Sequence, residues 1–445
     1  MQFEIDQQTL NDLAIFKNGG NKSIRSLFDK AKTLGGMEKF NQIFNNPLTD
    51  PQQIKDRLDM LGYFQSADFE FNADKTTCDF AEFYLEQHSK PHAFAKILGV
   101  LNRVSHVFYK ETEYYTIQQG VRSILKLLNA LKNFTAANDF DTLPKLLKET
   151  HSVITQILED KDFGFAIQLN PTQKLSALDI TRADYLFRNL RRDSIKTLLG
   201  IVYVLDVFTT VSSEGKKMGF SLPVVNSTGK KVLKIDGLFH PFVDNAVSNN
   251  IIFDYNQNVC FVTGTNMAGK STFLKATGIC VFLSQLGFPV PAANMETSTF
   301  KGIITTINLS DDIQSGHSHF YNEVLRVKHV AQKLNESQDL FVIFDELFRG
   351  TNVKDAYDAS LMIISAFSKM RNTFFMISTH IVEVANDLIN TTNINFKFME
   401  TTFDNEMPRF SYQLKDGITD EKLGMWIVKN EGIVEMIDKA IEQTS

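Results

Sequence analysis

The stretch of sequence that decides the fold runs from residue 259 to residue 272 and reads Val259-Cys260-Phe261-Val262-Thr263-Gly264-Thr265-Asn266-Met267-Ala268-Gly269-Lys270-Ser271-Thr272. It begins with an apolar run that is typical of a buried strand. Residues 264–271 then match the pattern G-x-x-x-x-G-K-[ST], whose glycines let the backbone fold tightly around phosphate oxygens. A helical pattern follows. The stretch therefore predicts a strand, a phosphate-binding loop and a helix in succession.

The residue types in this loop suit ATP bound together with Mg²⁺. Backbone N–H groups of the loop and the N-terminus of the following helix favour an anion. Lys270 is expected to reach the β- and γ-phosphates, and Ser271 is expected to bind Mg²⁺. The predicted ATP-binding residues are Gly264, Thr265, Asn266, Met267, Ala268, Gly269, Lys270, Ser271 and Thr272.

Two further apolar runs end in residues suited to phosphate chemistry. Residues 340–344 lead into Asp345 and Glu346, 75 residues after Lys270. Asp345 is expected to orient the Mg²⁺ through water, and Glu346 to polarise the attacking water as a general base. Residues 374–378 lead through Thr379 into His380, which can contact a γ-phosphate. The predicted catalytic residues are Glu346, His380 and Lys270.

A loop followed by an acidic pair and a strand-end histidine is typical of ATP-binding-cassette (ABC) ATPases. Such sites are completed by a second subunit, and the segment 310–320 is the candidate donor. Ser318, near the start of a predicted helix, is expected to offer its hydroxyl to the γ-phosphate in trans. Two alternatives remain for this segment: a metal bound by His317 and His319, or a plain Ser/Asp-rich helix cap.

The first half of the chain has helical periodicity, and the second half alternates strands with helices. Helical patterns lie around residues 92–109, 115–133, 143–158 and 182–213, with short gaps that favour a bundle. Beyond about residue 220 the short β-branched runs favour a parallel sheet. The segment 295–301 is predicted to be a flexible loop. The fold class is therefore α/β plus all-α, with predicted domains 1–218, 219–416 and 417–445.

Composition excludes several classes of protein. The formal charge of −6 gives no basic surplus for nucleic-acid binding, although a local patch can still bind phosphates. The 3 cysteines, at irregular spacing, form neither a disulfide framework nor a zinc pattern. The N-terminus lacks the features of a signal peptide, and no apolar run of about 18 residues predicts a membrane span. A reducing cytoplasm is expected.

Taken together, these motifs resemble the MutS family of DNA mismatch-repair ATPases. The carrying residues are Asn266 and Met267 in the loop, Asp345 through Asn352, Asp311 through Ser318, Thr379-His380, and His240-Pro241. The segments 23–49 and 198–208 resemble the start of that family's helical core and its lever helix, and 423–437 resembles its helical dimerisation element. The resemblance implies a homodimer that uses ATP and Mg²⁺ at composite sites and binds double-stranded DNA that is distorted or branched.

The chain also departs from the family pattern. The helical core begins near residue 1, so the mismatch-reading domain and the connector are expected to be missing, and residues 110–195 offer no strand-rich clamp. Phe80-Ala81-Glu82 has the spelling of the reading wedge but lies in a helical pattern. His319 replaces a usual Thr. The aromatic expected to stack on adenine is not clear, since Ala246 or Val247 falls near its place.

Contact with DNA is predicted for a basic cluster of Arg188, Arg191 and Arg192 on the expected lever helix. The alternative is a solvated helix face paired with acids such as Asp184 and Asp193. Two functions therefore stay open. The first is a MutS-like DNA-binding ATPase, related to mismatch repair or to recognition of distorted or branched DNA. The second is an ATP-switched protein-interaction module, with a protein partner and no direct DNA role.

Overall fold

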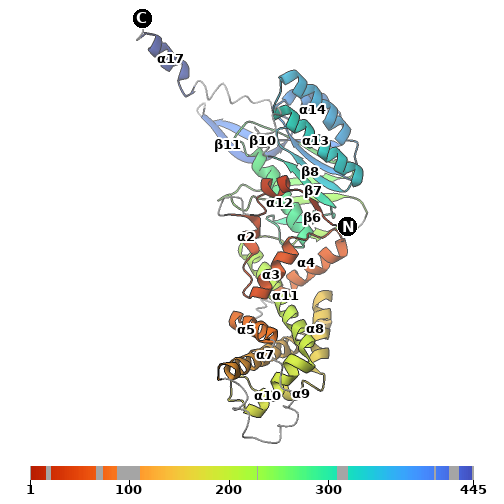
Figure 1. The fold of residues 1–445 in the computed structure, drawn as a ribbon. Helices are drawn as coiled ribbons and strands as arrows, with labels where there is room; N and C mark the ends of the chain where they lie inside the picture. The colour runs from red at the N-terminus through yellow and green to blue at the C-terminus, as the bar shows by residue number, and fades with distance from the viewer. Residues whose placement is uncertain are drawn as a thin grey trace. The chain divides into compact units, whose positions relative to one another are not determined.

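The chain forms two compact units, which are shown in Figure 1. The computed structural model describes residues 2–16, 22–66, 74–87, 111–227, 229–307, 319–404, 407–419 and 430–442. The unit that we call the α/β unit combines residues 1–24, 47–54 and 218–445, and the unit that we call the helical unit combines residues 25–46 and 55–217.

A seven-stranded sheet forms the centre of the α/β unit, with strand order β1-β7-β8-β9-β5-β10-β11. The strands are β1 (Glu4–Ile5), β7 (Gly302–Thr306), β8 (Leu340–Phe344), β9 (Phe374–Ser378), β5 (Val259–Thr263), β10 (Ile394–Asp404) and β11 (Met407–Asp416). All neighbouring strands are parallel except the antiparallel pair β10 and β11. Every residue of β5, β7, β8 and β9 is buried, because a parallel sheet covered on both faces needs apolar side chains on both.

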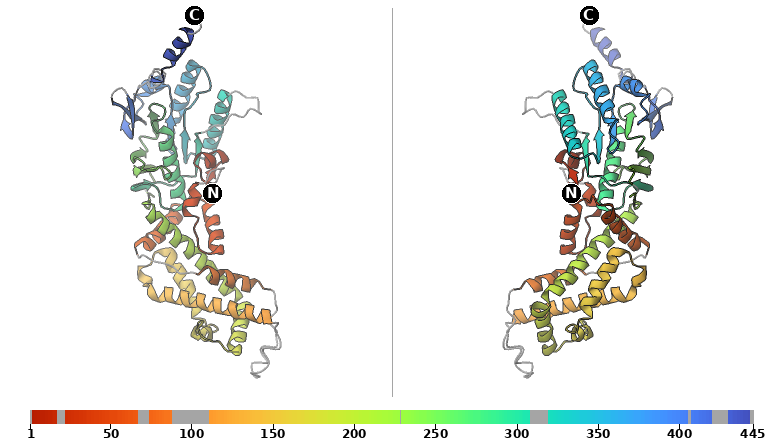
Figure 2. Two further views of the ribbon diagram at one scale, coloured as in Figure 1. Left: turned by 90° about the vertical axis from the view of Figure 1, so that its left-hand side faces the viewer. Right: turned by 90° about the vertical axis from the view of Figure 1, so that its right-hand side faces the viewer.

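Helices cover the two faces of this sheet, as the side views in Figure 2 show. On one face α13 (His319–Glu336), α14 (Val353–Phe367) and α15 (Val382–Leu388) share a core with strand residues such as Val342 and Phe344. On the other face lies α12 (Lys270–Leu286), where a Cβ at Gly278 would be 3.1 Å from the Cδ1 atom of Ile343. The carboxyl ends of β5, β7, β8 and β9 lie at one edge, where the predicted site residues follow.

A second, four-stranded sheet in this unit has the order β2-β6-β3-β4. Its strands are β2 (Val224–Val225), β6 (Asn294–Thr297), β3 (Val232–Leu238) and β4 (Asn249–Asp254). The prediction of a flexible loop over residues 295–301 is wrong for its first part, because β6 pairs with β3 and buries Met295. The last described helix is α17 (Ile433–Glu442).

The helical unit is built from helices that pack closely through small residues. They are α2 (Ile24–Phe28), α3 (Leu34–Phe44), α4 (Pro51–Ser66), α5 (Lys75–Glu86), α7 (Glu111–Ala137), the 3₁₀ helix η2 (Phe140–Thr142), α8 (Lys145–Leu158), α9 (Gly164–Gln168), α10 (Ala177–Tyr185), the π-helix η3 (Leu186–Leu190) and α11 (Arg192–Lys217). Gly120 of α7 faces the ring of Tyr84, and Gly35 of α3 faces the ring of Tyr203, so a side chain at either glycine would collide with an aromatic ring.

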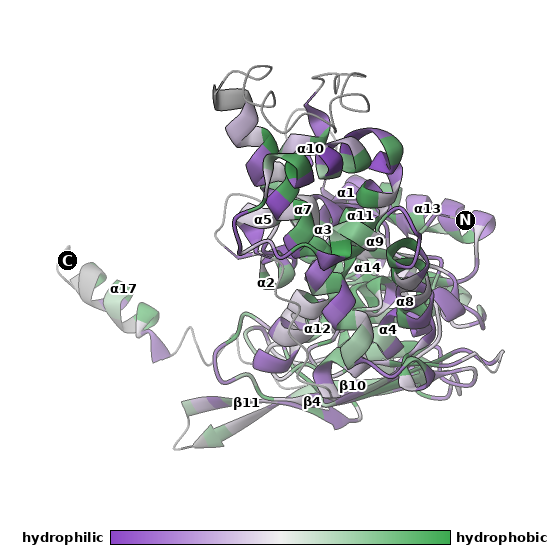
Figure 3. Cartoon of the chain, turned by 90° about the horizontal axis from the view of Figure 1, so that it is seen from below, coloured by the Kyte–Doolittle hydropathy of each residue, from purple (hydrophilic) through white to green (hydrophobic). Residues whose placement is uncertain are grey.

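Helix α11 is the core helix of this unit. By length and composition alone it could cross a membrane, but half of its most apolar window is buried inside the structure. Its buried positions include Leu198, Val202 and Leu205, and it packs on α3. Its acidic Asp206 accepts hydrogen bonds from the backbone N–H groups of Lys32 and Thr33 at 3.1 and 2.9 Å. Figure 3 colours the residues of α11 and of the other elements by hydropathy.

The helical predictions over 115–133 and 143–158 are confirmed by α7 and α8. The single helix predicted over 182–213 is instead α10, a π-helical turn and α11, because five residues adopt the wider turn at Leu186–Leu190. The pattern at 92–109 lies outside the described residues. The compact units differ from the predicted division at its N-terminal end, because residues 1–24 pack with the α/β unit rather than with the helices.

Candidate nucleotide site

The predicted phosphate-binding loop connects β5 to α12. Gly264 and Gly269 have φ angles of 138° and 99°, in the region that glycine favours. A side chain at Gly264 would also lie only 3.2 Å from the carbonyl oxygen of Met399. Met267 has a φ of 70° and is 73% exposed at the tip of the loop. Both glycines are therefore required by the backbone path of this loop.

Lys270, the first residue of α12, turns its side chain back over the loop. Its Nζ donates to the carbonyl oxygens of Gly264 at 2.8 Å and Thr265 at 3.1 Å. Burial lowers the pKa of Lys270, while the carboxylates of Glu346 and Asp345 act in the opposite direction. The ammonium group thus lies within the electrostatic reach of the acidic pair. Ser271 and Thr272 follow it with exposed side chains.

The acidic pair lies at the end of β8 and is connected to the ends of both neighbouring strands. The backbone N–H of Asp345 donates to the carbonyl oxygen of Thr306 on β7 at 2.9 Å. The hydroxyl of Ser378, on β9, donates to the Asp345 carboxylate at 2.5 Å and accepts from the Glu346 N–H at 3.0 Å. Ser378 is the last residue of the predicted strand 374–378. Its role in joining the two acids becomes visible only once β8 and β9 pair.

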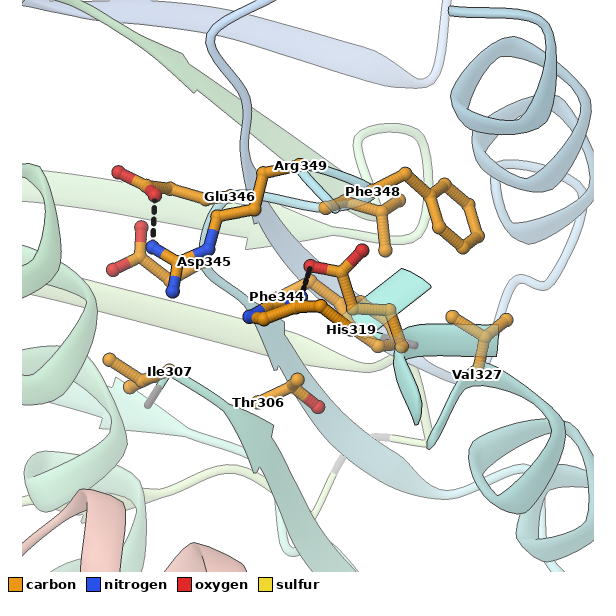
Figure 4. Close-up of a pocket in the computed structure, with 11 residues that line it drawn as sticks. Thr306, Ile307, His319, Val327, Phe344, Asp345, Glu346, Phe348 and Arg349 are labelled. Atoms are coloured by element: carbon orange, nitrogen blue, oxygen red, sulfur yellow. Dashed lines mark hydrogen bonds and ion pairs between the residues drawn. The ribbon is translucent and has the colours of Figure 1, made fainter. Parts of the chain in front are cut away.

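Glu346 is held by two side chains, one on each carboxylate oxygen. One carboxylate oxygen lies 2.7 Å from Nε2 of His380, and the other lies 2.9 Å from a guanidinium nitrogen of Arg349. Figure 4 shows Arg349 extending back toward Glu346. The hydrogen bond from His380, with help from Arg349, lowers the pKa of Glu346 to about 2 even though burial acts to raise it. The predicted catalytic pair is therefore in direct contact, and Glu346 is an ionised carboxylate at neutral pH.

A pocket beside the acidic pair is lined by residues of β7, α13 and the segment after β8, among them Thr306, Ile307, His319, Glu323, Asp345 and Arg349. Glu323 of α13 lies 3.4 Å from Nδ1 of His319 and accepts from the N–H of Gly350 at 3.3 Å. Burial raises the pKa of Glu323. The segment after the acidic pair is thus fastened to the start of α13.

Ser318, the predicted donor in trans, lies outside the described residues, as do Asp311, Asp312 and His317. Its sequence neighbour His319 opens α13. The alternative of a metal bound by His317 and His319 stays a prediction, because His317 lies outside the described residues. Among the described residues there is no group of three or more potential metal-binding side chains.

An aromatic side chain that sequence analysis did not select lies beside the loop. A Cβ at Gly269 would be 3.2 Å from the Cδ1 atom of Tyr412, on β11. Tyr412 has a φ of 56°, and its carbonyl oxygen accepts from the side chain of Asn249 at 2.9 Å. Its side chain is 46% exposed, whereas Val247 presents only a small aliphatic group. No sequence signal identifies Tyr412, because its place depends on the pairing of β11 with β10.

The predicted DNA-binding arginines occupy three different environments in the helical unit. Arg188 is buried, and its guanidinium donates to both carboxylate oxygens of Asp184 at 2.6 and 2.7 Å. Arg191 is partly exposed and pairs with Asp160 and Asp162 at 2.8 Å. Arg192 donates to the carbonyl oxygen of Leu85 at 2.6 Å. Arg188 therefore has a structural role, and the proposed phosphate contact is not compatible with its burial.

The part of the chain that matches a known family domain lies within the α/β unit. Residues 260–445 match the family domain described as MutS domain V. A DNA mismatch repair protein MSH7 of Arabidopsis thaliana is 25% identical over 97% of this chain and 43% of its own length. The DNA mismatch repair protein MutS of Leuconostoc citreum is 28% identical over 68% of this chain and 36% of its own. The chain thus spans less than half the length of these relatives.

The parallel sheet, the glycine loop before α12 and the match to domain V place the α/β unit in the class of ATPase-domain folds. Within that class the relatives agree on one family. The chain is a MutS-related protein.

Proposed function

We propose that this protein hydrolyses ATP at the edge of the sheet where β5, β8 and β9 end. The observation that carries the proposal is the convergence of Lys270, Asp345, Glu346 and His380 from three separate strand ends. Burying an ionisable group costs free energy unless the group has a partner. Buried ionisable groups that converge from separate elements are therefore common at functional sites. The match to MutS domain V supports the same proposal.

The residues present fit ATP and Mg²⁺ as ligands. The loop from Gly264 to Gly269 has the glycine-dependent path that brings backbone N–H groups to phosphates, and Lys270 supplies a cation at its centre. Ser271 and Asp345 are the proposed Mg²⁺ ligands, since hydroxyl and carboxylate oxygens suit this ion. Mg²⁺, when bound, neutralises phosphate charge. We propose that Tyr412 faces the adenine, because Ala246 and Val247, which fall near the place of the expected aromatic, are not aromatic.

The roles of the protein groups in hydrolysis follow from their contacts. Glu346, ionised and held by His380 and Arg349, accepts a hydrogen bond from the attacking water and orients it. His380 lies beside this carboxylate and is placed to contact the terminal phosphate. Lys270 neutralises charge on the β- and γ-phosphates. We propose that Ser318 of a second copy completes the site and that the protein acts as a homodimer in the cytoplasm.

We propose that ATP binding and hydrolysis change the affinity of the dimer for double-stranded DNA. The relatives are named DNA mismatch repair proteins, which favours mismatched DNA. We propose DNA that is distorted or branched as a further substrate class. An ATP-switched grip on a protein partner is the second candidate. It is favoured by the contacts that all three predicted arginines make within the helical unit.

One experiment separates the two candidates. The ATPase rate is measured with linear, mismatched and branched DNA, each at low and at physiological salt, because phosphate contacts weaken steeply with salt. A change in rate with one of these DNAs supports the DNA role and identifies the substrate class. An ATPase rate that is the same with and without each of the three DNAs favours the protein-interaction module. No ATPase under any condition contradicts the proposed activity itself.

A further inference from the structure

The N-terminal segment of the chain, residues 3–15, is built into the α/β unit rather than into the helices that follow it. Its strand β1 adds to the sheet beside β7, with the N–H of Glu4 donating to the carbonyl oxygen of Lys301 at 2.7 Å. Its helix α1 (Gln7–Asp12) follows, and Leu13 packs on Gly278 of α12, where a Cβ would be 2.8 Å away. The segment therefore contacts both the sheet and the helix that carries Lys270.

Helix α1 holds the carboxyl end of β7 through side chains. The N–H of Thr305 donates to the hydroxyl oxygen of Thr9 at 2.9 Å. One carboxylate oxygen of Asp12 accepts from the Thr305 hydroxyl at 2.7 Å and from the N–H of Ile307 at 2.9 Å. The other oxygen accepts from the side chain of Gln8 at 2.9 Å. Asp12 is 3% exposed, so these contacts are shielded from competing water.

Arg326 of α13 holds the same strand end from another direction. Its guanidinium donates to the carbonyl oxygen of Thr305 at 2.6 Å and to the hydroxyl of Thr306 at 3.2 Å. It also forms an ion pair with Asp6, at the start of α1. Residues 305–307 are therefore fixed by α1 and α13 together.

The strand end that is fixed in this way is a direct neighbour of the proposed Mg²⁺ ligand. The carbonyl oxygen of Thr306 accepts from the N–H of Asp345 at 2.9 Å. Thr306 and Ile307 also line the pocket beside Asp345 and Glu346 (Figure 4). A shift of residues 305–307 would thus be passed to Asp345 through a backbone hydrogen bond.

We propose that Asp12 is a positioning residue for the nucleotide site: by holding Thr305 and Ile307, it fixes Thr306 and through it the carboxylate of Asp345. The inference rests on the proposed ATPase function. Loss of the Asp12 carboxylate leaves the Ile307 N–H and the Thr305 hydroxyl buried without this acceptor, and such groups move to find another. Asp345 then binds Mg²⁺ less well, whereas the phosphate loop around Lys270 is left in place.

The test compares Asp12→Ala with Asp12→Asn, with Gln7→Ala as the matched control. An asparagine oxygen can still accept from Thr305 and Ile307, and Gln7 lies exposed on the same helix. ADP affinity is measured by calorimetry with Mg²⁺ and with chelator, beside the Mg²⁺ dependence of hydrolysis. Mg²⁺ raises the affinity for ADP by a certain factor, and we expect this factor to be about tenfold smaller in Asp12→Ala than in the wild type. The ADP affinity in chelator is expected to be unchanged. Asp12→Asn and Gln7→Ala are expected to match the wild type.

An Asp12→Ala variant whose Mg²⁺-dependent gain equals that of the wild type would overturn the positioning role. If this variant does not fold, Thr305→Val decides the question. This substitution removes one hydrogen-bond donor to Asp12 at nearly constant side-chain volume. We expect the Mg²⁺-dependent gain in ADP affinity to fall by about threefold, which corresponds to one weak hydrogen bond. No loss in Thr305→Val would also overturn the proposal. A wild-type chain that does not hydrolyse ATP would instead contradict the proposed function.

Discussion

Each of the two units contains a carboxylate that is in contact with an arginine, and the two arrangements differ in what they leave available. In the α/β unit, Glu346 contacts His380 and Arg349 at a strand end, and His380 is 39% exposed. In the helical unit, Asp184 binds both Arg188 and the hydroxyl of Tyr84, and the side chains of the ion pair are only 2% and 4% exposed. The first carboxylate faces a pocket, whereas the second is enclosed by its partners.

This difference distinguishes a charged side chain that is available to a ligand from one that only stabilises the fold. Asp184 and Arg188 neutralise each other on consecutive turns of helix and satisfy their hydrogen bonds internally, so no ligand is needed to explain them. Glu346 follows β8 together with Asp345, whereas Lys270 follows β5 and His380 follows β9. Convergence of charges from separate elements costs desolvation that local helix geometry does not explain.

The largest effect is expected for Lys270→Ala in the α/β unit. Loss of the ammonium removes charge neutralisation at the phosphates, so kcat should fall by about 100-fold or more, which is about 2.7 kcal/mol of transition-state stabilisation. Steady-state phosphate release measures this. Lys301→Ala is the control, because Lys301 forms only a partly exposed ion pair with Asp339 at 3.4 Å. Equal rates in Lys270→Ala and wild type would remove Lys270 from the site.

The enclosed pair is expected to matter for stability instead. Arg188→Met leaves the buried carboxylate of Asp184 without its cationic partner and should lower the free energy of unfolding by about 3–5 kcal/mol. Arg191→Met breaks ion pairs that are about one-third exposed and should cost about 0–1 kcal/mol. Denaturant unfolding of the two variants compares them directly. If Arg191→Met proved the more destabilising, our distinction between the two environments would be wrong.

A smaller effect is expected at Tyr412, which lies beside the phosphate loop. If its ring stacks on adenine, Tyr412→Ala should weaken ATP binding by about tenfold, about 1.4 kcal/mol, within the range of base–aromatic stacking. Tyr255→Ala is the matched control, since Tyr255 is 50% exposed on the same unit and stacks on Arg371. Fluorescence titration with ATP gives both affinities. Equal affinities in the two variants would assign adenine binding elsewhere.

The smallest effect concerns the titration of Glu346. Its pKa of about 2 lies below the ordinary 4.5, so its contribution to stability is complete above pH 4.5 and is lost as the pH falls toward 2. Because His380 is the largest cause of the shift, His380→Ala should raise the pKa of Glu346 more than Arg349→Met does. Carboxyl NMR titration resolves the two variants. A larger change in Arg349→Met would reverse the assigned causes.

Sequence patterns located most of the α/β unit and its site. The strands 259–263, 340–344 and 374–378 are observed at those residues, because fully buried parallel strands are continuous apolar runs. The polar residues after each run then lie at one edge, where Lys270 comes within electrostatic reach of Asp345 and Glu346, and His380 contacts Glu346. The alternation of strands and helices indicates a parallel sheet, whose strands end at the same edge. Which side chains touch there depends on the pairing of β8 with β7 and β9.

Other features depend on pairings between distant parts of the chain. Residues 3–15 resemble a short helix of the bundle in sequence, yet they join β7 and α12, because β1 finds its partner strand almost 300 residues later. Tyr412 reaches the loop only through the β10–β11 pair. The burial of Arg188 was open in the sequence, since Asp184 one turn earlier fits an exposed pair equally well.

The most direct test of the proposed site is the rate of ATP hydrolysis by Glu346→Gln beside the wild type, with nucleotide affinity measured on both. Glutamine keeps the size of the side chain but lacks the charge that orients and polarises water. We expect magnesium-dependent hydrolysis by the wild type, a fall of about 10²–10⁴-fold in the variant and unchanged ATP affinity. A Glu346→Gln variant that hydrolyses ATP as fast as the wild type would contradict the assignment of this strand edge as the catalytic site.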